Sequence, residues 1–438
     1  MTAISPLDDR YASKVSDVSQ MFSNLGSTKY KLIVECEYLI FFASLVDANN
    51  PDLRPEIIRS IYQNFDNDDL QEIINHERTT NHDIQALVEY LKSRIPRSLK
   101  KWVHFGLTSQ DINSPAMVLA HRDFNNMILG DELDKLTKIL TDLAVRNEDT
   151  IMLTFTHGQP ATPSTFGKQM IVFIDKLSGI SSDLFNNYTY RTKMGGSNGD
   201  LTGLKFCFPN IEWEQEVSNF LRSTFELEKT MSTTQIDDYV NYFKLFQIYE
   251  RYCYLLINLC QDMWMYIHKK YLKLITIKEE VGSSAMPHKV NPIHFENAEG
   301  NLKISANLFH TIGSSIVLSR MQRDLTDSTM LRNVGVACGH MILAIRNICT
   351  GLSRIDVNTY EINRDLDGNE AVFMEFFQLK LRQWDIPDAY NVCKNYARGN
   401  SDLRIDDFVR HIGETYTELT NEQLAELNMD IDNIIKSI

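Results

Sequence analysis

Apolar side chains recur at intervals of three and four residues through several long parts of this chain. The clearest case is the segment 238–275, whose apolar positions are Tyr242, Leu245, Phe246, Tyr249, Cys253, Leu256, Ile257, Cys260, Trp264 and Ile267. This spacing places them on one face of an α-helix, so we predict a long helix here. The opposite side is also largely apolar, at Tyr252, Tyr254 and Leu255. Such a helix is buried on most sides, inside a bundle or at a subunit interface.

Proline positions limit where the other helices can lie. The eleven prolines leave proline-free tracts at 116–159, 164–208, 210–286 and 293–386. A proline inside a helix costs about 3 kcal/mol, so long helices belong in these tracts. The same periodicity predicts further helices over 124–149, 164–187, 297–319 and 334–352. Strand patterns are weak, and the best short candidate is 204–209.

These patterns predict an all-α protein with a central bundle of long helices at about residues 103–352. Smaller helical segments are expected on either side of the bundle. The 438 residues are enough for two or three domains. We find no internal repeat and no low-complexity segment.

The charge balance excludes some classes of partner. A formal net charge of -14 argues against nucleic acid or an anionic membrane as a partner of the whole surface. An anionic ligand would then need local basic clusters. Seven scattered cysteines without a CxxC favour reduced thiols in a cytoplasmic protein. The first 23 residues do not resemble a signal peptide, and the apolar stretch 252–267 is too short to cross a bilayer.

The segment 282–292 has the sequence Gly-Ser-Ser-Ala-Met-Pro-His-Lys-Val-Asn-Pro. Its two prolines exclude a regular helix or strand, so we predict a loop. Serine, glycine and proline also form ordinary turns. This loop, however, combines two hydroxyls, an imidazole, an ammonium and a carboxamide, and loops that concentrate polar groups are common ligand sites.

Four more polar segments interrupt the helical pattern, at 79–83, 105–113, 156–163 and 319–332. The first suits a helix N-cap formed by Thr or Asn, and its lone histidine has an ordinary structural explanation. The second offers small donors near a helix start, which favour anions, although capping explains it about equally well.

The third of these segments places His157 in a tight Gly/Pro turn before a long helix, which suits a general acid or base. The fourth has three arginines in a Ser/Thr-rich stretch. Arginine binds carboxylate and phosphate bidentately, but a solvated charged run is the alternative explanation.

Metal and cofactor motifs are absent from the sequence. There is no HExxH, no GxGxxG and no Walker sequence, and the glycine-rich run 195–199 is only a weak phosphate-loop match. We therefore predict neither a metal nor a cofactor.

Taken together, the segments resemble the fumarase/aspartase superfamily, and within it the bacterial-type adenylosuccinate lyase family. The resemblance rests on 5–11, 80–83, 105–111, 156–163, 282–292 and 322–329. It implies three all-α domains, at 1–102, 103–352 and 353–438. It also implies a homotetramer whose central bundles form a twenty-helix core, with each active site built from three chains.

The resemblance implies β-elimination of fumarate from adenylosuccinate, which gives AMP, and from succinyl-aminoimidazole carboxamide ribotide (SAICAR), which gives AICAR. It implies that Ser283 is the base and His157 the general acid, with Glu296 paired to that histidine. Lys289 and Asn291 would hold the succinyl carboxylates with Thr108 and Ser109. The remaining expected site residues are Arg10, Tyr11, Asn81, His82, Asp83, Gln235, Asn297, Arg323, Ser328, Thr329 and Arg332.

Two alternatives remain at this point. A sister enzyme such as argininosuccinate lyase or aspartase lacks a phosphorylated substrate, whereas His82 and the arginine cluster favour one. A structural homologue without activity is disfavoured by the joint presence of Ser283, His157 and Lys289. The segment 193–199 is a loose version of the glycine-rich turn of the family, and it is not expected to take part in the chemistry.

Overall fold

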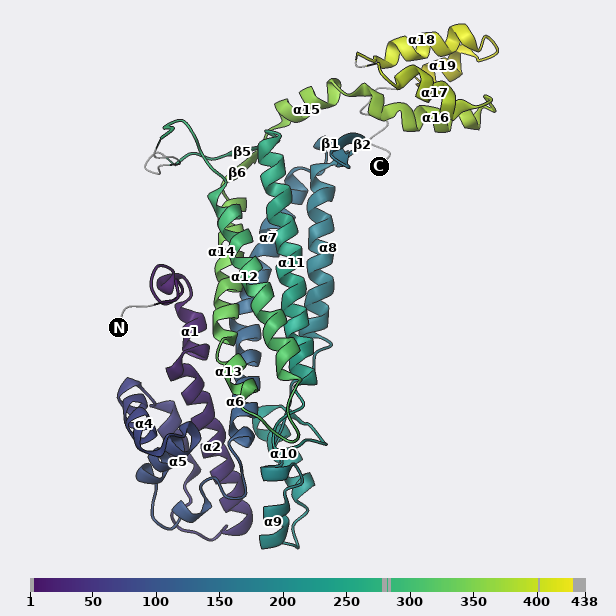
Figure 1. The fold of residues 1–438 in the computed structure, drawn as a ribbon. Coiled ribbons are helices and arrows are strands. Elements are labelled where there is room, and N and C mark those ends of the chain that lie inside the picture. The colour runs from purple at the N-terminus through teal and green to yellow at the C-terminus, as the bar shows by residue number, and fades with distance from the viewer. Residues whose placement is uncertain (1–3, 278–281, 283–284, 401, 428–438) are drawn as a thin grey trace. The chain divides into compact units, whose positions relative to one another are not determined.

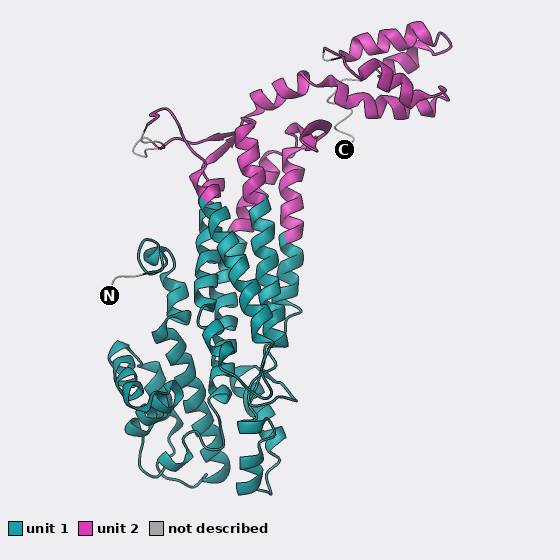
Figure 2. Cartoon of the chain, viewed as in Figure 1, with its two compact units in different colours: residues 1–135, 177–258, 297–348 teal, residues 136–176, 259–296, 349–438 magenta. Residues whose placement is uncertain are grey.

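The computed structural model describes residues 4–277, 282, 285–400 and 402–427 (Figure 1). The chain divides into two compact units (Figure 2). Unit 1 comprises residues 1–135, 177–258 and 297–348, and unit 2 comprises 136–176, 259–296 and 349–438. The boundary falls inside five long helices, so each of them contributes residues to both units. Ser283 lies outside the described residues.

The predicted all-α class is confirmed, because helices form most of the described chain (Figure 1). The five long helices are α7 (Gly130–Arg146), α8 (Phe166–Phe185), α11 (Val240–His268), α12 (Ile293–Ile316) and α14 (Val334–Leu352). They correspond to the five helices predicted from periodicity, with ends that differ by up to seven residues. The division into three domains along the sequence stays a prediction.

Shorter helices complete both units. Unit 1 has α1 (Ser16–Phe22), α2 (Asn24–Val46), α3 (Pro55–Gln63), α4 (Asn67–Thr80), α5 (Asp83–Arg94), α6 (Gln110–Phe124), α9 (Thr202–Cys207), α10 (Trp213–Phe225) and α13 (Thr326–Leu331). Unit 2 has α15 (Thr359–Asp367), α16 (Met374–Gln383), α17 (Ala389–Ala397), α18 (Ile405–Thr415) and α19 (Asn421–Leu427). The 3-10 turns are η1 (Ala12–Lys14), η2 (Lys100–Trp102), η4 (Gly196–Asn198) and η5 (Glu370–Phe373).

Strands occur as three two-stranded pairs within the described residues. They are β1 (Ile151–Thr156) with β2 (Gln159–Thr165), β3 (Arg191–Thr192) with β4 (Glu228–Lys229), and β5 (Leu272–Leu274) with β6 (Ile355–Val357). The predicted strand at 204–209 is wrong, because most of it lies in α9. Leu204 is the one buried side chain of α9. A single buried position provides no period that could distinguish a helix from a strand.

A π-helical turn, η3 (Asn125–Leu129), joins α6 to α7. The fully buried Asn125 side chain donates to Tyr190 Oη (2.9 Å) and accepts from Tyr249 Oη (2.7 Å). Shortly after this turn, the Glu132 carboxylate lies 3.1 Å from Arg346, which also pairs with Asp17 at 2.5 Å. The turn and this ion-pair network fix the start of α7 within unit 1.

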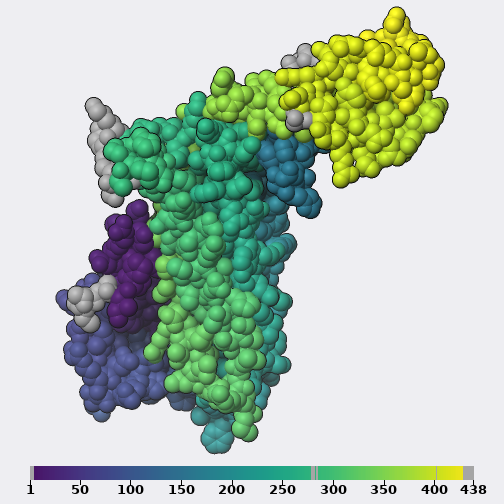
Figure 3. Space-filling model, turned by 45° about the horizontal axis from the view of Figure 1, so that its top comes forward, coloured from purple at the N-terminus to yellow at the C-terminus, as the bar shows by residue number. Residues whose placement is uncertain are grey.

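In unit 2 the C-terminal helices pack around one apolar cluster. The cluster includes Phe373, Phe377, Phe408 and Ile412, and Leu153 of β1 is buried in the same cluster. Figure 3 shows helices α16 to α19, in yellow, as one compact body. The β1–β2 hairpin is therefore anchored to the C-terminal helices by its own apolar side chain.

One segment of the described chain, Thr326–Leu352, is long and apolar enough to cross a membrane by length and composition. In the structure 72% of its most apolar window is buried within the protein. A core helix of a soluble protein has these properties, and α14 lies in the core of the fold.

His121 of α6 is a buried histidine without an ion pair in the described structure. Its side chain is 0% exposed, Nδ1 lies 3.0 Å from the Met117 carbonyl oxygen, and the Phe22 ring contacts it edge-on at 5.0 Å. Nε2 has no hydrogen-bond partner among the described residues. Burial lowers the pKa of His121 to about 4.

We expect acid to destabilise the protein through His121. Below its ordinary pKa of 6.5 the unfolded chain takes up a proton that the folded protein refuses until about pH 4. The free energy of unfolding should therefore fall by about 3 kcal/mol as the pH drops through this window, and it should be unaffected above it. Urea unfolding of the wild type and of His121→Phe at pH 7 and pH 4.5 tests this. Equal pH dependence in both proteins would contradict the assignment.

Candidate active site

The expected site residues are distributed over both units. Unit 2 contains four of the described ones: His157, Lys289, Asn291 and Glu296. Unit 1 contains Arg10, Tyr11, Asn81, His82, Asp83, Thr108, Ser109, Gln235, Asn297, Arg323, Ser328, Thr329 and Arg332. Within unit 1, the contacts described next bring several of these residues together from distant parts of the sequence.

His82 is the N-cap of α5, where Thr or Asn was expected. Asn81 adopts a left-handed conformation (φ 50°) that ends α4, and the next residue is extended. The His82 Nδ1 atom accepts from the Gln85 amide at 3.3 Å, which places the proton on Nε2. That Nε2 lies 3.4 Å from Ser109 Oγ and so donates to it. Two expected residues that lie 27 positions apart therefore meet.

Asp83, the first residue of α5, forms an ion pair with Lys31 at 2.8 Å and accepts from the Ile84 amide at 2.8 Å. Burial raises the pKa of this carboxyl group, but Lys31 and the amide outweigh burial. The net result is a pKa below the ordinary value, so the carboxylate is charged near neutral pH.

Tyr11 and Asn297 also meet, although 286 positions separate them. The Asn297 side-chain amide donates to Tyr11 Oη at 3.2 Å, and its oxygen accepts from Asn301 and Asn347 at 3.0 Å each. The Arg10 guanidinium lies 5.8 Å from the centre of the Tyr11 ring. This places a cation beside a fixed hydroxyl, as expected for a site that binds an anionic ligand.

The arginine-rich segment is ordered by its own acid. Backbone donation from Thr326 and Arg320 lowers the pKa of Asp324 to about 2, and this carboxylate also pairs with the Arg320 side chain. Arg320 is thereby used within the segment. Across the described residues, no ion pair is found for Arg323 or Arg332, so both guanidinium groups are available to a ligand.

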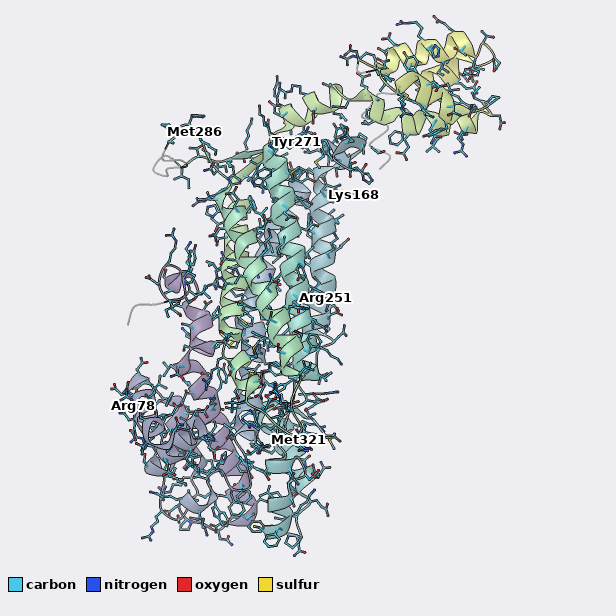
Figure 4. All side chains as sticks on the ribbon, in the orientation of Figure 1. Arg78, Lys168, Arg251, Tyr271, Met286 and Met321 are labelled. Carbon is cyan, nitrogen blue, oxygen red and sulfur yellow. The ribbon has the colours of Figure 1, made fainter. Side chains whose placement is uncertain are left out.

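A pocket of about 520 Å³ in unit 1 brings these parts together. Asp83, Ser328 and Arg332 line it, and so do Lys31 and Gln110. This volume is in the range that holds a small-molecule ligand. Gln235, Arg323 and Thr329 do not line this pocket and stay predictions. The exposed Met321 (90%) lies beside this arginine-rich segment (Figure 4).

In unit 2, His157 lies at the tip of the β1–β2 hairpin. Both His157 (φ 54°) and Gly158 (φ 72°) are left-handed, between the paired residues Thr156 and Gln159, as in a type I′ turn. The tight turn is confirmed, but a strand, β2, separates it from the long helix α8. The imidazole is exposed on a rigid two-residue connection.

Two contacts hold this hairpin from outside. Thr162 Oγ1 of β2 donates to the Glu375 carboxylate of α16. The Lys269 ammonium lies 4.8 Å from the centre of the Phe155 ring and pairs with Asp365 at 2.8 Å. Tyr271, labelled in Figure 4, donates to the same carboxylate at 2.6 Å.

The described part of the 282–292 loop is closed by a side chain. Asn291 donates to the Gly282 carbonyl oxygen at 2.6 Å. A Cβ at Gly282 would lie 2.0 Å from the Lys289 carbonyl oxygen, so no larger residue fits there. Met286 marks this loop in Figure 4. Lys289 is exposed, and Ser283, the expected base, lies outside the described residues.

Glu296 lies in the first turn of α12, where the helix dipole favours a carboxylate. It accepts from Trp264 Nε1 at 3.2 Å. No hydrogen bond between Glu296 and His157 is present in the described part of unit 2, and their pairing stays a prediction. No group of three or more metal-binding side chains was found among the described residues.

Two residues of the site region were missed by the sequence reasoning. Asp111 of α6 accepts from the Thr108 amide at 2.7 Å and is fully buried together with Lys193. Asp111 stood in a recognised motif, but the sequence carried no signal that Lys193 would be its partner.

Comparisons with known proteins agree with this picture. Residues 16–304 match the sequence profile of the family described as Lyase, and residues 319–431 match the one described as Adenylosuccinate lyase C-terminal. The adenylosuccinate lyase of Dictyostelium discoideum is 38% identical over 420 residues, which cover 93% of this chain and 90% of that protein. The adenylosuccinate lyase of Escherichia coli (strain K12) is 35% identical over 408 residues, which cover 91% and 89%.

Solved structures agree at the level of the fold. The fumarate lyase from Mesorhizobium sp. BNC1 matches with a TM-score of 0.79 at 18% identity, covering 96% of this chain and 95% of that one. The 3-carboxy-cis,cis-muconate lactonizing enzyme from Pseudomonas putida matches with a TM-score of 0.76 at 19% identity, covering 94% and 92%. The sequence matches span almost the whole chain, and with them the chain belongs to the adenylosuccinate lyase family of the fumarase/aspartase superfamily.

Proposed function

We propose that this chain is a lyase that eliminates fumarate from adenylosuccinate to give AMP, and from SAICAR to give AICAR. The observation that carries the proposal is the extent of the match: relatives named adenylosuccinate lyase align over 91 to 93% of the chain. The reaction serves purine nucleotide biosynthesis.

The chemistry needs a base and an acid at once. The proton to be removed is on carbon beside a carboxylate, and the transition state collects negative charge there, so donors must be preorganised around it. Ser283 removes this proton as an alkoxide, and the bond from the neighbouring carbon to nitrogen breaks as the double bond of fumarate forms. His157 gives its proton to the departing nitrogen.

Cations and hydroxyls bind the anionic parts of the substrate. Lys289 and Asn291 hold the succinyl carboxylates together with Thr108 and Ser109. The phosphate and ribose lie against Arg10, Tyr11, Arg323, Ser328 and Arg332, with His82 as a further donor. The Nε2–H form of His82 supports this role, because it presents a proton beside Ser109.

The functional form is a homotetramer in which three chains build each site. Exposed apolar side chains on the long helices support this proposal. On α11, Tyr254 is 55% and Met265 52% exposed, and on α8 and α12, Ile171 and Ile304 are each 48% exposed. A second copy would bury them. All seven cysteines are unbonded, which supports the cytoplasm as the compartment.

Fumarate release tests the proposal directly. Purified protein should release fumarate from adenylosuccinate and from SAICAR, and not from argininosuccinate. Activity on argininosuccinate alone would replace the proposal by the sister enzyme. A folded protein that releases fumarate from none of the three would be an inactive structural homologue.

A further inference from the structure

The Asp111 carboxylate lies directly behind the turn that carries Thr108 and Ser109. Its Oδ2 accepts from the Thr108 amide at 2.7 Å. Its Oδ1 accepts from the amides of Gly195 and Gly196 at 2.8 and 3.2 Å, and lies 2.7 Å from Lys193 Nζ. A carboxylate has about four acceptor positions, so this one is saturated and its orientation is fixed.

Lys193 is a lysine with no exposed surface, as is the carboxylate it meets (0% for both side chains). Its Nζ also donates to the Gly196 carbonyl oxygen at 2.7 Å, and its backbone amide donates to Ser114 Oγ at 3.2 Å. The same Ser114 hydroxyl donates to the buried Asp237 at 3.0 Å. The ammonium therefore lies in a region that contains two buried carboxylates.

The turn in front of this pair has a particular pattern of free donors. The Thr108 amide is consumed by Asp111 and cannot bind a ligand. Ser109 Oγ accepts from His82 Nε2 at 3.4 Å, so its own hydroxyl proton can point elsewhere. An anion bound here must then be held by hydroxyl groups, which carry no charge, while a full negative charge lies just behind them.

We infer that Lys193 cancels the charge of Asp111 so that the Thr108–Ser109 turn can hold a substrate carboxylate, and that the two are positioning residues of the reaction. The inference rests on the proposed function, in which this turn binds a succinyl carboxylate. Without the ammonium, the buried carboxylate would repel the substrate through a poorly screened interior.

Stability alone is a poor explanation for the pair. Two charges pay a large desolvation cost on burial, and apolar residues of similar size often replace such a pair without loss. Burial lowers the pKa of Lys193, and Asp111 opposes this shift, so the ammonium depends on its partner for its charge. The pair instead joins the glycine-rich segment 193–199 to the start of α6.

Three variants test the inference: Lys193→Met, the double variant Asp111→Asn/Lys193→Met, and the control Lys205→Met. Lys205 also pairs with a carboxylate in unit 1, Glu214 at 3.1 Å, but on the surface. We expect Lys193→Met to raise KM for adenylosuccinate by about tenfold or more, with a smaller change in kcat. The double variant, which removes both charges, should bring KM back to within about threefold of the wild type. The control should match the wild type.

The outcomes separate charge from architecture. A folded Lys193→Met with unchanged KM, or a double variant as impaired in KM as the single one, overturns the inference. So does a double variant that fails to fold, because the pair is then structural. If only the single variant fails to fold, a near-wild-type KM of the double variant supports the charge balance. Wild-type protein without lyase activity would instead refute the proposed function, before any variant is made.

Discussion

Replacing Ser283 with alanine is expected to remove nearly all turnover while leaving the protein folded and assembled. In the proposed mechanism the Ser283 oxygen takes the proton from carbon, and no neighbouring group replaces it. Loss of a positioned base lowers kcat by a factor of about 10² to 10⁴. Fumarate release under saturating adenylosuccinate measures the loss, and size-exclusion chromatography checks the assembly.

The loop provides a matched control for this experiment. Ser284 follows directly in the sequence, so Ser284→Ala removes the same hydroxyl from the same loop. We expect it to keep most of the activity. Full activity in Ser283→Ala would refute the mechanism, and the reverse pattern, with Ser284→Ala inactive, would assign the base to the wrong serine.

A comparable loss is expected when His157 is replaced by glycine, because the leaving nitrogen then departs without a proton. The variant should lose a factor of about 10² to 10⁴ in kcat. The imidazole is exposed at the hairpin tip, and glycine accepts the left-handed φ of 54° without strain. Imidazole added to the solution should therefore enter the vacated space and restore part of the rate.

The neighbouring residue separates the imidazole from the turn that carries it. Gly158→Ala adds a methyl group where nothing lies within 4 Å, but at φ 72° it strains the backbone. A modest loss in Gly158→Ala without rescue by imidazole is the expected contrast. If imidazole fails to rescue His157→Gly, or rescues both variants alike, His157 is not the proton donor.

Periodicity located the long helices well because burial imposes it. The segment 334–352 was predicted from apolar spacing, and α14 runs from Val334 to Leu352. The β1–β2 hairpin was not predicted, since Pro160 and Pro163 argued against a strand. In a two-stranded pair each strand is an edge, where a residue without an N–H is tolerated.

The site was predictable segment by segment and not as an arrangement. Local sequence pointed to His82 and to Ser109 separately, but their contact depends on how α5 and α6 pack. Lys193 could not be predicted at all, because lysine is almost always exposed and its partner Asp111 lies 82 positions earlier. Only the fold places an ammonium against that carboxylate.

The π-helical turn at Asn125–Leu129 has a consequence for the length of the chain. A π turn contains one residue more than an α turn, and here the fully buried Asn125 binds two tyrosines. Deleting one residue would regularise the backbone but rotate the start of α7 by about 100°, turning Glu132 away from Arg346. Insertions and deletions between these two anchors should therefore be selected against, and alignment gaps of true relatives should fall outside them.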